Sequence, residues 1–306
     1  VSLYHENRDA QNLFSCSASG ARSEAIALFC QNTICPAVLL LCYNTGVEKE
    51  QKQTAERGRA LKKENTEKKF IYQVQPDVAD LNENNLLKPY AYQRLFSVVA
   101  DQHLMKIDLS EDKLAKYGLA WVLVSLSFEI RKPVEGMVPL YANTWHSGRR
   151  GPYFRREFVF RNKDNQIAFQ GSSFSILLDR GKRSIYRKKE LPFPLIDAVE
   201  EITIQAGPGN KSHPDFSKVE DRKVRNSDID CLGHVNNCRY GEFAYDVFTE
   251  QEITNLSRLK RMDTYFHSEL RLEDAFSVAK ACEDNRIFCR GYNNRSSVSF
   301  DMVYEF

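Results

Sequence analysis

The sequence lacks a surplus of charge of either sign. Its 306 residues include 43 lysines and arginines against 41 aspartates and glutamates, which gives a net charge of +2 at pH 7. Binding of nucleic acid by the surface as a whole is therefore not indicated, and an anionic partner would have to meet a local basic patch. The 42% apolar and 27% charged residues are typical of a soluble globular protein.

Cysteine is missing between residues 43 and 230, and no two of the eight cysteines have CxxC spacing. That spacing is the usual sign of a metal or redox site, so neither is indicated. A chain of this length does not need a disulfide framework to fold. We therefore expect reduced thiols and an intracellular protein.

A long, uninterrupted hydrophobic run is also missing. The most apolar stretch, residues 25–44, is interrupted by Gln31, Asn32 and Thr33 and is split by Pro36, which makes it a poor membrane span. It begins too far from the start for a signal peptide and has no clear basic flank or cleavage site. We expect no membrane span.

A charged segment separates this region from the rest of the chain. Residues 47–69 contain 13 charged side chains among 23, so they cannot bury a core and are expected to form a solvated helix or linker. We therefore interpret residues 1–68 as a poorly ordered leader and charged linker.

From residue 69 onward the sequence predicts the same structural unit twice. Each copy has a short strand-like stretch, then a helix with an apolar face, then several alternating strand-like runs, which is the order of an α+β unit. The expected units are residues 69–190 and 219–306, joined by a proline-containing linker at 191–218. In the first unit we expect a helix over 90–106 and strands over 119–130, 137–145, 153–162 and 166–179, with turns such as 132–136 and 146–151 between them. In the second we expect a strand at 222–230, a helix over 236–251, and strands at 263–272, 276–284, 286–293 and 296–306.

Laying residues 74–90 on 224–240 without gaps gives a constant offset of 150 residues. This pairing places Asn84 opposite His234 and Leu86 opposite Asn236. Only the second unit then carries a plausible chemical site.

That site is the stretch SDIDCLGHVNNCRYGEF, residues 227–243. Asn236 or Asn237 is a good N-cap for the following helix, and Gly233 permits a turn before it. Asp230 and His234 are four residues apart, and a carboxylate beside an imidazole suits activation of water. Backbone N–H groups at such a helix start can also stabilise an oxyanion. Capping and turn formation explain the same residues without catalysis. A Cys–His nucleophile is poorly supported, because nothing in the sequence would lower the pKa of Cys231 or Cys238.

This stretch resembles the helix-opening motif of hotdog-fold thioesterases. Over residues 70–306 the chain resembles the acyl-ACP thioesterases of plants and bacteria, through WVL at 121–123, TWHSGRRGPYFRREF at 144–158, GSSFSILLDRGKR at 171–183 and YFHSELRLEDAF at 265–276. The resemblance implies an α+β fold of two tandem hotdog domains, each a long helix wrapped by an antiparallel β-sheet. It also implies hydrolysis of the thioester of fatty acyl-ACP, with release of free fatty acid and termination of chain elongation.

The resemblance also implies the site residues. Asp230 and His234 match the family's Asp and His, and Glu269 matches a Glu on a later strand. The family's Asn is replaced by Leu232, which is a departure, and Asn236 is a candidate substitute. Asp230, assisted by His234 and Glu269, would activate a water or attack the carbonyl itself. The N–H groups around Gly233, Val235 and Asn236 would stabilise the oxyanion. No metal or other cofactor is expected.

The expected partner is acyl carrier protein, which is acidic. The run at 180–189 contains Arg180, Lys182 and Arg183 and has no acidic residue, so it is the candidate docking patch; residues 149–156 hold a second group of four arginines. The first unit is expected to shape the acyl pocket with helix 90–106 and strand 121–128. Two alternative functions stay open: an acyl-CoA thioesterase of the same fold and a non-catalytic acyl-binding protein. The tandem repeat could act as a pseudo-dimer, but the family also forms true dimers, so a homodimer stays open as well. The cytoplasm is the expected location, or the plastid stroma if the source is a plant.

Overall fold

The computed structural model describes residues 70–188, 190–195 and 198–306. The expected leader and charged linker at 1–68 lie outside the described residues. Within the described part, no helix is both long and apolar enough to cross a membrane.

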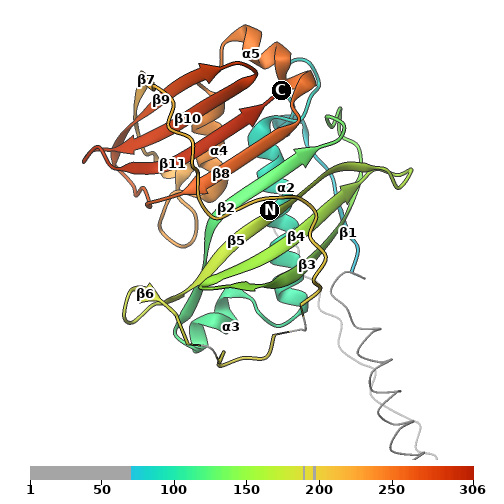
Figure 1. Ribbon diagram of the computed structural model, residues 1–306, viewed down its shortest axis with the longest axis vertical. Coiled ribbons are helices and arrows are strands. Elements are labelled where there is room, and N and C mark those ends of the chain that lie inside the picture. The colour runs from blue at the N-terminus through green and yellow to red at the C-terminus, as the bar shows by residue number, and fades with distance from the viewer. Residues whose placement is uncertain (1–69, 189, 196–197) are drawn as a thin grey trace, which may run out of the picture. The chain divides into compact units, whose positions relative to one another are not determined.

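One continuous sheet dominates the structure (Figure 1). Its strands are β1 (Tyr72–Val74), β2 (Leu119–Ile130), β3 (Leu140–Arg150), β4 (Tyr153–Arg161), β5 (Ile167–Asp179), β6 (Ser184–Ile185), β7 (Ser217–Lys223), β8 (Arg261–Phe266), β9 (Ala275–Glu283), β10 (Arg286–Asn293) and β11 (Val298–Glu305). They are ordered β1-β3-β4-β5-β2-β8-β11-β10-β9-β7, with β6 beside β5. The two halves of this order mirror each other about the antiparallel β2–β8 pair. The expected tandem repeat is thus present in the sheet.

Each half places a helix against the same face of the sheet (Figure 1). The helices are α2 (Pro89–Lys106), α3 (Glu111–Lys116), α4 (Asn237–Tyr245) and α5 (Glu250–Thr254). Proline at the first position of α2 has the backbone conformation that a helix start needs. Helices α2 and α4 pack closely because Gly241 has no side chain; a Cβ there would lie 2.9 Å from Cβ of Tyr90. The predicted α+β hotdog architecture is confirmed.

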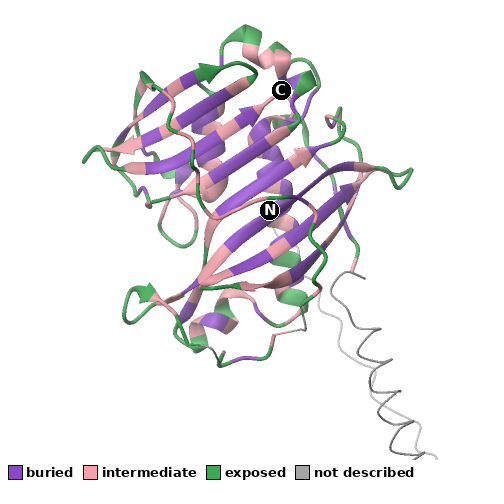
Figure 2. Cartoon of the chain, viewed as in Figure 1, coloured by how far each residue is buried: buried purple, intermediate pink, exposed green. Residues whose placement is uncertain are grey.

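The core lies between these helices and the sheet and is shared by both halves. Figure 2 shows the buried residues concentrated along the central strands and the helices behind them. The core cluster includes Phe96 and Phe128 of the first half with Phe243 and Phe300 of the second. The expected acyl-pocket walls, helix 90–106 and strand 121–128, contribute to this packing, and their role in holding an acyl chain stays a prediction.

Four local expectations were wrong. The strand expected at 263–272 ends at Phe266, so Glu269 lies beyond it. Residues 146–151 are not a separating turn, because β3 continues to Arg150 through a bulge between His146 and Gly148. The second long helix ends at Tyr245 instead of reaching residue 251. The strand expected at 222–230 lies earlier, since β7 ends at Lys223 and Asn226–Asp228 form a 3-10 turn.

The linker expected at 191–218 is held against the sheet by hydrogen bonds. The indole N–H of Trp145 donates to Glu201 O at 3.0 Å, and the Ser125 hydroxyl donates to Gly207 O at 2.9 Å. The guanidinium of Arg155 donates to Ile204 O at 2.6 Å and pairs with the fully buried Glu157. Arg155, one of the four arginines at 149–156, is therefore buried and cannot be part of a docking patch.

Candidate active site

The stretch Ser227–Phe243 forms a tight turn that leads into α4. Oδ1 of Asp230 accepts the N–H of Leu232 at 2.9 Å, and Gly233 follows with φ +81°, which glycine adopts without steric cost. The side-chain oxygen of Asn236 accepts the N–H of Cys238 at 2.9 Å. Asn236, one of the two residues predicted as the N-cap, is thus the N-cap of α4 and determines where the helix begins.

The first half contains the same turn, at a different offset from the one expected. An isolated bridge joins Leu81 to Leu87, and its counterpart joins Ile229 to Val235. The hydrogen bonds around these bridges repeat in the same order. The two turns are therefore related by 148 residues, and the expected offset of 150 was wrong.

The corrected offset changes which residues correspond. Asn82 takes the place of Asp230, because its N–H bonds Leu86 O as the N–H of Asp230 bonds His234 O. Leu86 then takes the place of His234. The first turn has neither a carboxylate nor an imidazole at these positions, so only the second turn can carry acid–base chemistry.

Asp230 and His234 lie together, as expected. Oδ2 of Asp230 is 3.6 Å from Nδ1 of His234 and 3.4 Å from Nδ2 of Asn236. Nδ1 of His234 is also 3.2 Å from the carbonyl oxygen of Val235. Because a carbonyl only accepts, this contact favours a proton on Nδ1 and leaves Nε2 of the neutral ring free to accept one. The side chain of His234 is 27% exposed, so solvent can reach it.

The backbone N–H groups expected to stabilise an oxyanion are already engaged. Those of Gly233, Val235 and Asn236 donate to the carbonyls of Asp230, Leu270 and Asp228 at 3.0, 2.9 and 2.9 Å. In this conformation the turn uses these three donors to hold its own shape, and their role at an oxyanion stays a prediction. In the described part of the chain, the amides at this turn that form no hydrogen bond are those of Cys231, His234 and Asn237.

Glu269 lies on the segment beside the turn but does not touch the Asp–His pair. The bond from Val235 N–H to Leu270 O fixes the two segments side by side. Val235 and Leu270 both point into the core. The Glu269 side chain is 55% exposed, and Arg271 pairs with it at 3.0 Å. In this conformation the structure joins Asp230 to His234 and leaves Glu269 apart.

Tyr240 holds these elements together, a role that the sequence analysis missed. Its buried hydroxyl accepts the N–H of Leu270 at 3.0 Å. Burial raises the pKa of Tyr240 to about 12, and the nearby carboxylates of Glu269 and Asp230 add to the shift. The sequence showed only an aromatic residue on the apolar face of a helix, which is the ordinary pattern of a core residue.

A thiol nucleophile finds no support. Burial raises the pKa of Cys238 to about 11, so this thiol is protonated at neutral pH. Its Sγ lies 3.8 Å from the hydroxyl of Ser97.

The candidate docking residues lie on the turn after β5 and face solvent. Arg180, Lys182 and Arg183 are all exposed. Burial raises the pKa of Glu111, at the start of α3, and the positive charge of Arg180 opposes that shift.

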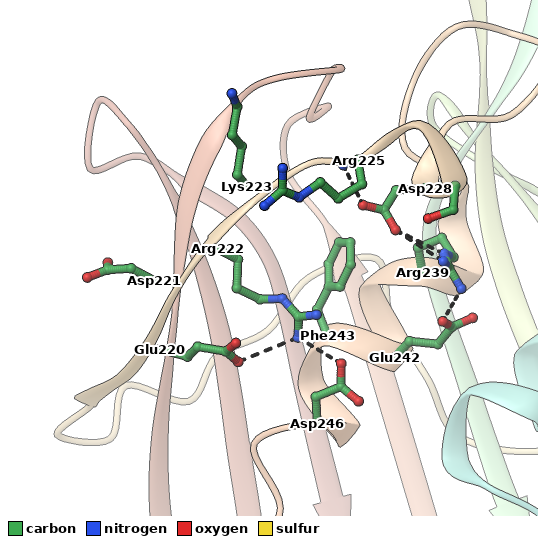
Figure 3. Close-up of a pocket in the computed structure, with 11 residues that line it drawn as sticks. Glu220, Asp221, Arg222, Lys223, Arg225, Asp228, Arg239, Glu242, Phe243 and Asp246 are labelled. Atoms are coloured by element: carbon green, nitrogen blue, oxygen red, sulfur yellow. Dashed lines mark hydrogen bonds and ion pairs between the residues drawn. The ribbon is translucent and has the colours of Figure 1, made fainter.

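An open hollow of about 570 Å³ lies beside the motif, between β7 and α4 (Figure 3). Most of its lining side chains are charged, and several of them pair with one another. Arg222 bridges Glu220 and Asp246, and Arg239 bridges Asp228 and Glu242 (Figure 3). Asp230 and His234 are not among its lining residues. This hollow is a neighbour of the candidate active site and does not contain it.

Comparison with known families decides the identity of the chain. The sequence matches the acyl-ACP thioesterase N-terminal domain over residues 65–190 and the acyl-ACP thioesterase C-terminal domain over residues 211–302. Together the two matches cover more than half of the chain. The chain belongs to the acyl-ACP thioesterase family.

Solved structures show the same fold. An acyl-ACP thioesterase from Bacteroides thetaiotaomicron has 20% sequence identity and a TM-score of 0.65, with 78% of this chain and 97% of that chain covered. The 12:0-ACP thioesterase from Umbellularia californica has 13% identity and a TM-score of 0.61, with 77% and 96% covered. No curated protein sequence gives a significant match. The thioesterase described here hydrolyses the thioester of fatty acyl groups carried by acyl carrier protein.

Proposed function

We propose that the Asp230–His234 pair activates the water that hydrolyses the fatty acyl-ACP thioester. The observation that carries this proposal is the contact of Nδ1 of His234 with the carbonyl of Val235 and the carboxylate of Asp230. Held in this way, the ring presents Nε2 as a proton acceptor, and Asp230 stabilises the positive charge that the ring gains.

The reaction then proceeds in two proton transfers. Nε2 of His234 takes a proton from water as the water oxygen bonds to the carbonyl carbon. The carbon–sulfur bond breaks, the proton passes to the departing sulfur of the carrier, and free fatty acid is released. The amide of Asn237, the first residue of α4, is the proposed oxyanion donor, assisted by the positive end of the helix dipole. We assign Glu269 to the same site as a second carboxylate that reaches it after rearrangement.

Docking of the carrier protein is proposed at Arg180, Lys182 and Arg183. Their exposure and their positive charge support this assignment, because an acidic carrier would meet complementary charge there.

A single-turnover reaction in H₂¹⁸O tests the water mechanism. Enzyme in excess over acyl-ACP should release fatty acid that carries one ¹⁸O atom, because water attacks the carbonyl directly. The peptide that contains Asp230 should stay unlabelled. Label in that peptide, with unlabelled fatty acid from the first turnover, would establish attack by the Asp230 carboxylate and overturn the proposed role of water.

A further inference from the structure

Strand β2 is longer than the strand it meets at the centre of the sheet. It pairs with β5 from Leu119 to Ile130, but with β8 only from Ser125 to Glu129. Among the described residues, no strand pairs with the stretch Leu119–Val124 on its β8 side. This stretch is therefore a free sheet edge inside a chain whose other central strands are paired on both sides.

Burial changes at the point where β8 begins. Ser125 and Phe128, which lie within the paired stretch, are completely buried. Val122 is 36% exposed, and most of its neighbours in the free stretch are half-buried. The edge is thus accessible from solvent.

The hydrogen-bonding direction of this edge follows from one contact. Gly118 O accepts the N–H of Arg180, next to β5, at 2.9 Å. Main-chain groups alternate in direction along an antiparallel strand, so those of Leu119, Trp121 and Leu123 point away from β5. The free edge offers N–H and C=O groups spaced over about 13 Å from Leu119 to Leu123, at about 3.3 Å per residue.

The two ends of this edge carry different chemistry. At one end Leu119 pairs with Asp179, which is followed directly by the basic turn of Arg180, Lys182 and Arg183. At the other end Ser125 pairs with Tyr265 of β8, which is antiparallel to β2, and the chain continues from Tyr265 to Glu269. The free edge therefore has a cluster of positive charge at one end and adjoins, at its other end, the strand that leads to the segment flanking the Asp230–His234 pair.

We propose that this edge binds the phosphopantetheine arm of acyl carrier protein as an added strand. The phosphate of the arm lies at the basic turn, and its two amide groups hydrogen-bond to the main chain at Trp121 and Leu123. The acyl thioester at the tip of the arm then reaches Asp230 and His234. This inference rests on the proposed function, since it assumes that the reaction takes place at that pair.

The arm fits this edge better than another protein strand does. It has a phosphate at one end, where the chain places three exposed cations, and amides along its length, where the chain places unpaired main-chain groups. It ends in the thioester, which is the group on which the Asp230–His234 pair acts. A second copy of the chain, paired antiparallel along this edge, would place the two basic turns at opposite ends of the pairing and would supply neither with an anionic group.

A series of thioesters tests the amide contacts in the unaltered enzyme. The acyl group stays constant while the thiol changes from pantetheine, with two amides, to N-acetylcysteamine, with one, to ethanethiol, with none. A net hydrogen bond contributes a factor of about ten, so kcat/KM should fall about tenfold at each step. Equal kcat/KM values for all three thioesters would overturn the proposal.

Substitution of Leu123 tests the edge itself. Proline at this position removes an N–H that points away from β5, so the β5 pairing is kept. Leu123→Pro should lower kcat/KM for acyl-pantetheine about tenfold and leave the ethanethiol ester unchanged. The matched control, Leu123→Ala, keeps the N–H and should retain the preference for pantetheine.

The possible failures can be told apart. If the unaltered enzyme hydrolyses no thioester at all, the proposed function fails. If it hydrolyses all of them but Leu123→Pro weakens the three equally, as a general loss of structure would, the edge proposal is overturned and the function stands. A dimer that becomes monomeric in Leu123→Pro, with unchanged substrate preference, would assign the edge to a second copy of the chain and also overturn the proposal.

Discussion

At the scale of single residues, the candidate site depends on what surrounds one carboxylate. Oδ1 of Asp230 is used by the turn, and Oδ2 faces the amide of Asn236 and the ring of His234. The sequence was sufficient to bring Asp230 and His234 together, because residues four apart in a tight turn lie on the same side. It was not sufficient to identify the oxyanion donors. Which amides a turn uses internally depends on partners such as Leu270, which is distant in sequence.

Leu232 provides a prediction at this scale, because it occupies the position of the family's asparagine. Its side chain is 56% exposed, so a polar residue can replace it without disturbing the core. Leu232→Asn should raise kcat for acyl-ACP at least tenfold, since one well-placed donor to the reacting oxygen contributes a factor of about 10²–10³. Steady-state release of fatty acid measures the effect. Leu232→Ala is the control and should leave kcat unchanged; equal rates for the two variants would show that no donor is missing.

A second residue-scale prediction concerns Asp301, on the sheet away from the site. Burial tends to raise its pKa, but hydrogen bonds from His267 and Arg290 outweigh burial and hold the pKa of Asp301 below its usual value. A lowered carboxyl pKa stabilises the fold above the unfolded value of about 4, and that stability is lost as the pH falls through the folded pKa.

Asp301→Asn should therefore lower the free energy of unfolding by about 2 kcal/mol at pH 7, the value of hydrogen bonds to a charged group. The difference between the two proteins should shrink below pH 4. Urea unfolding at pH 7 and at pH 3.5 measures it. A destabilisation that is the same at both pH values would contradict the assigned role of the Asp301 charge.

At the scale of elements, the sequence predicted long strands well and short elements less well. Residues 119–130 were expected as a strand and form β2 with the same bounds, because their apolar run is bordered by turns. The second helix was predicted to be too long, since Val247 and Phe248 continue the apolar pattern. Both residues are buried, but they lie beyond the end of the helix at Tyr245. A pattern of apolar, buried residues was therefore not enough to predict where the helix ends.

The start of α4 provides the prediction at this scale. Asn236 caps the helix through its oxygen and contacts Asp230 through its nitrogen. Asn236→Ala should lower the free energy of unfolding by about 1 kcal/mol, because the cap is lost, and should also lower kcat. Asn236→Ser keeps a capping oxygen but has no amide nitrogen, so it should retain the stability and still lose activity. If either variant loses stability but keeps its activity, Asn236 serves only as the helix cap and is not part of the active site.

At the scale of the whole molecule, the two halves form one sheet and one core. The repeat was visible in the sequence as an order of elements, but its register was not. The two turns share backbone geometry while their side chains differ, so matching residue types gave an offset two residues too long. The meeting of β2 with β8 could not be predicted either, because it joins strands more than 130 residues apart in the chain.

Docking provides the prediction at this scale. Reversing the charge of Arg180, Lys182 and Arg183 to glutamate should raise KM for acyl-ACP at least tenfold, because an acidic carrier then meets like charge. KM for an acyl-ethanethiol ester, which has neither carrier nor phosphate, should stay unchanged. The comparison should be made at low ionic strength, where surface charges are least screened. An equal rise for both substrates would show that the three side chains serve the fold and not the carrier.

The most direct measurement is fatty acid release from acyl-ACPs of several chain lengths by the 306-residue protein and by Asp230→Asn. The substitution keeps the size of the side chain and its acceptor oxygen for Leu232, so the turn should stay folded, which circular dichroism can verify. We predict release by the unaltered protein and a loss of at least a hundredfold in Asp230→Asn, because the general base His234 then lacks the carboxylate that stabilises its protonated ring. Undiminished release by the folded variant would show that the thioester is hydrolysed without the Asp230 carboxylate.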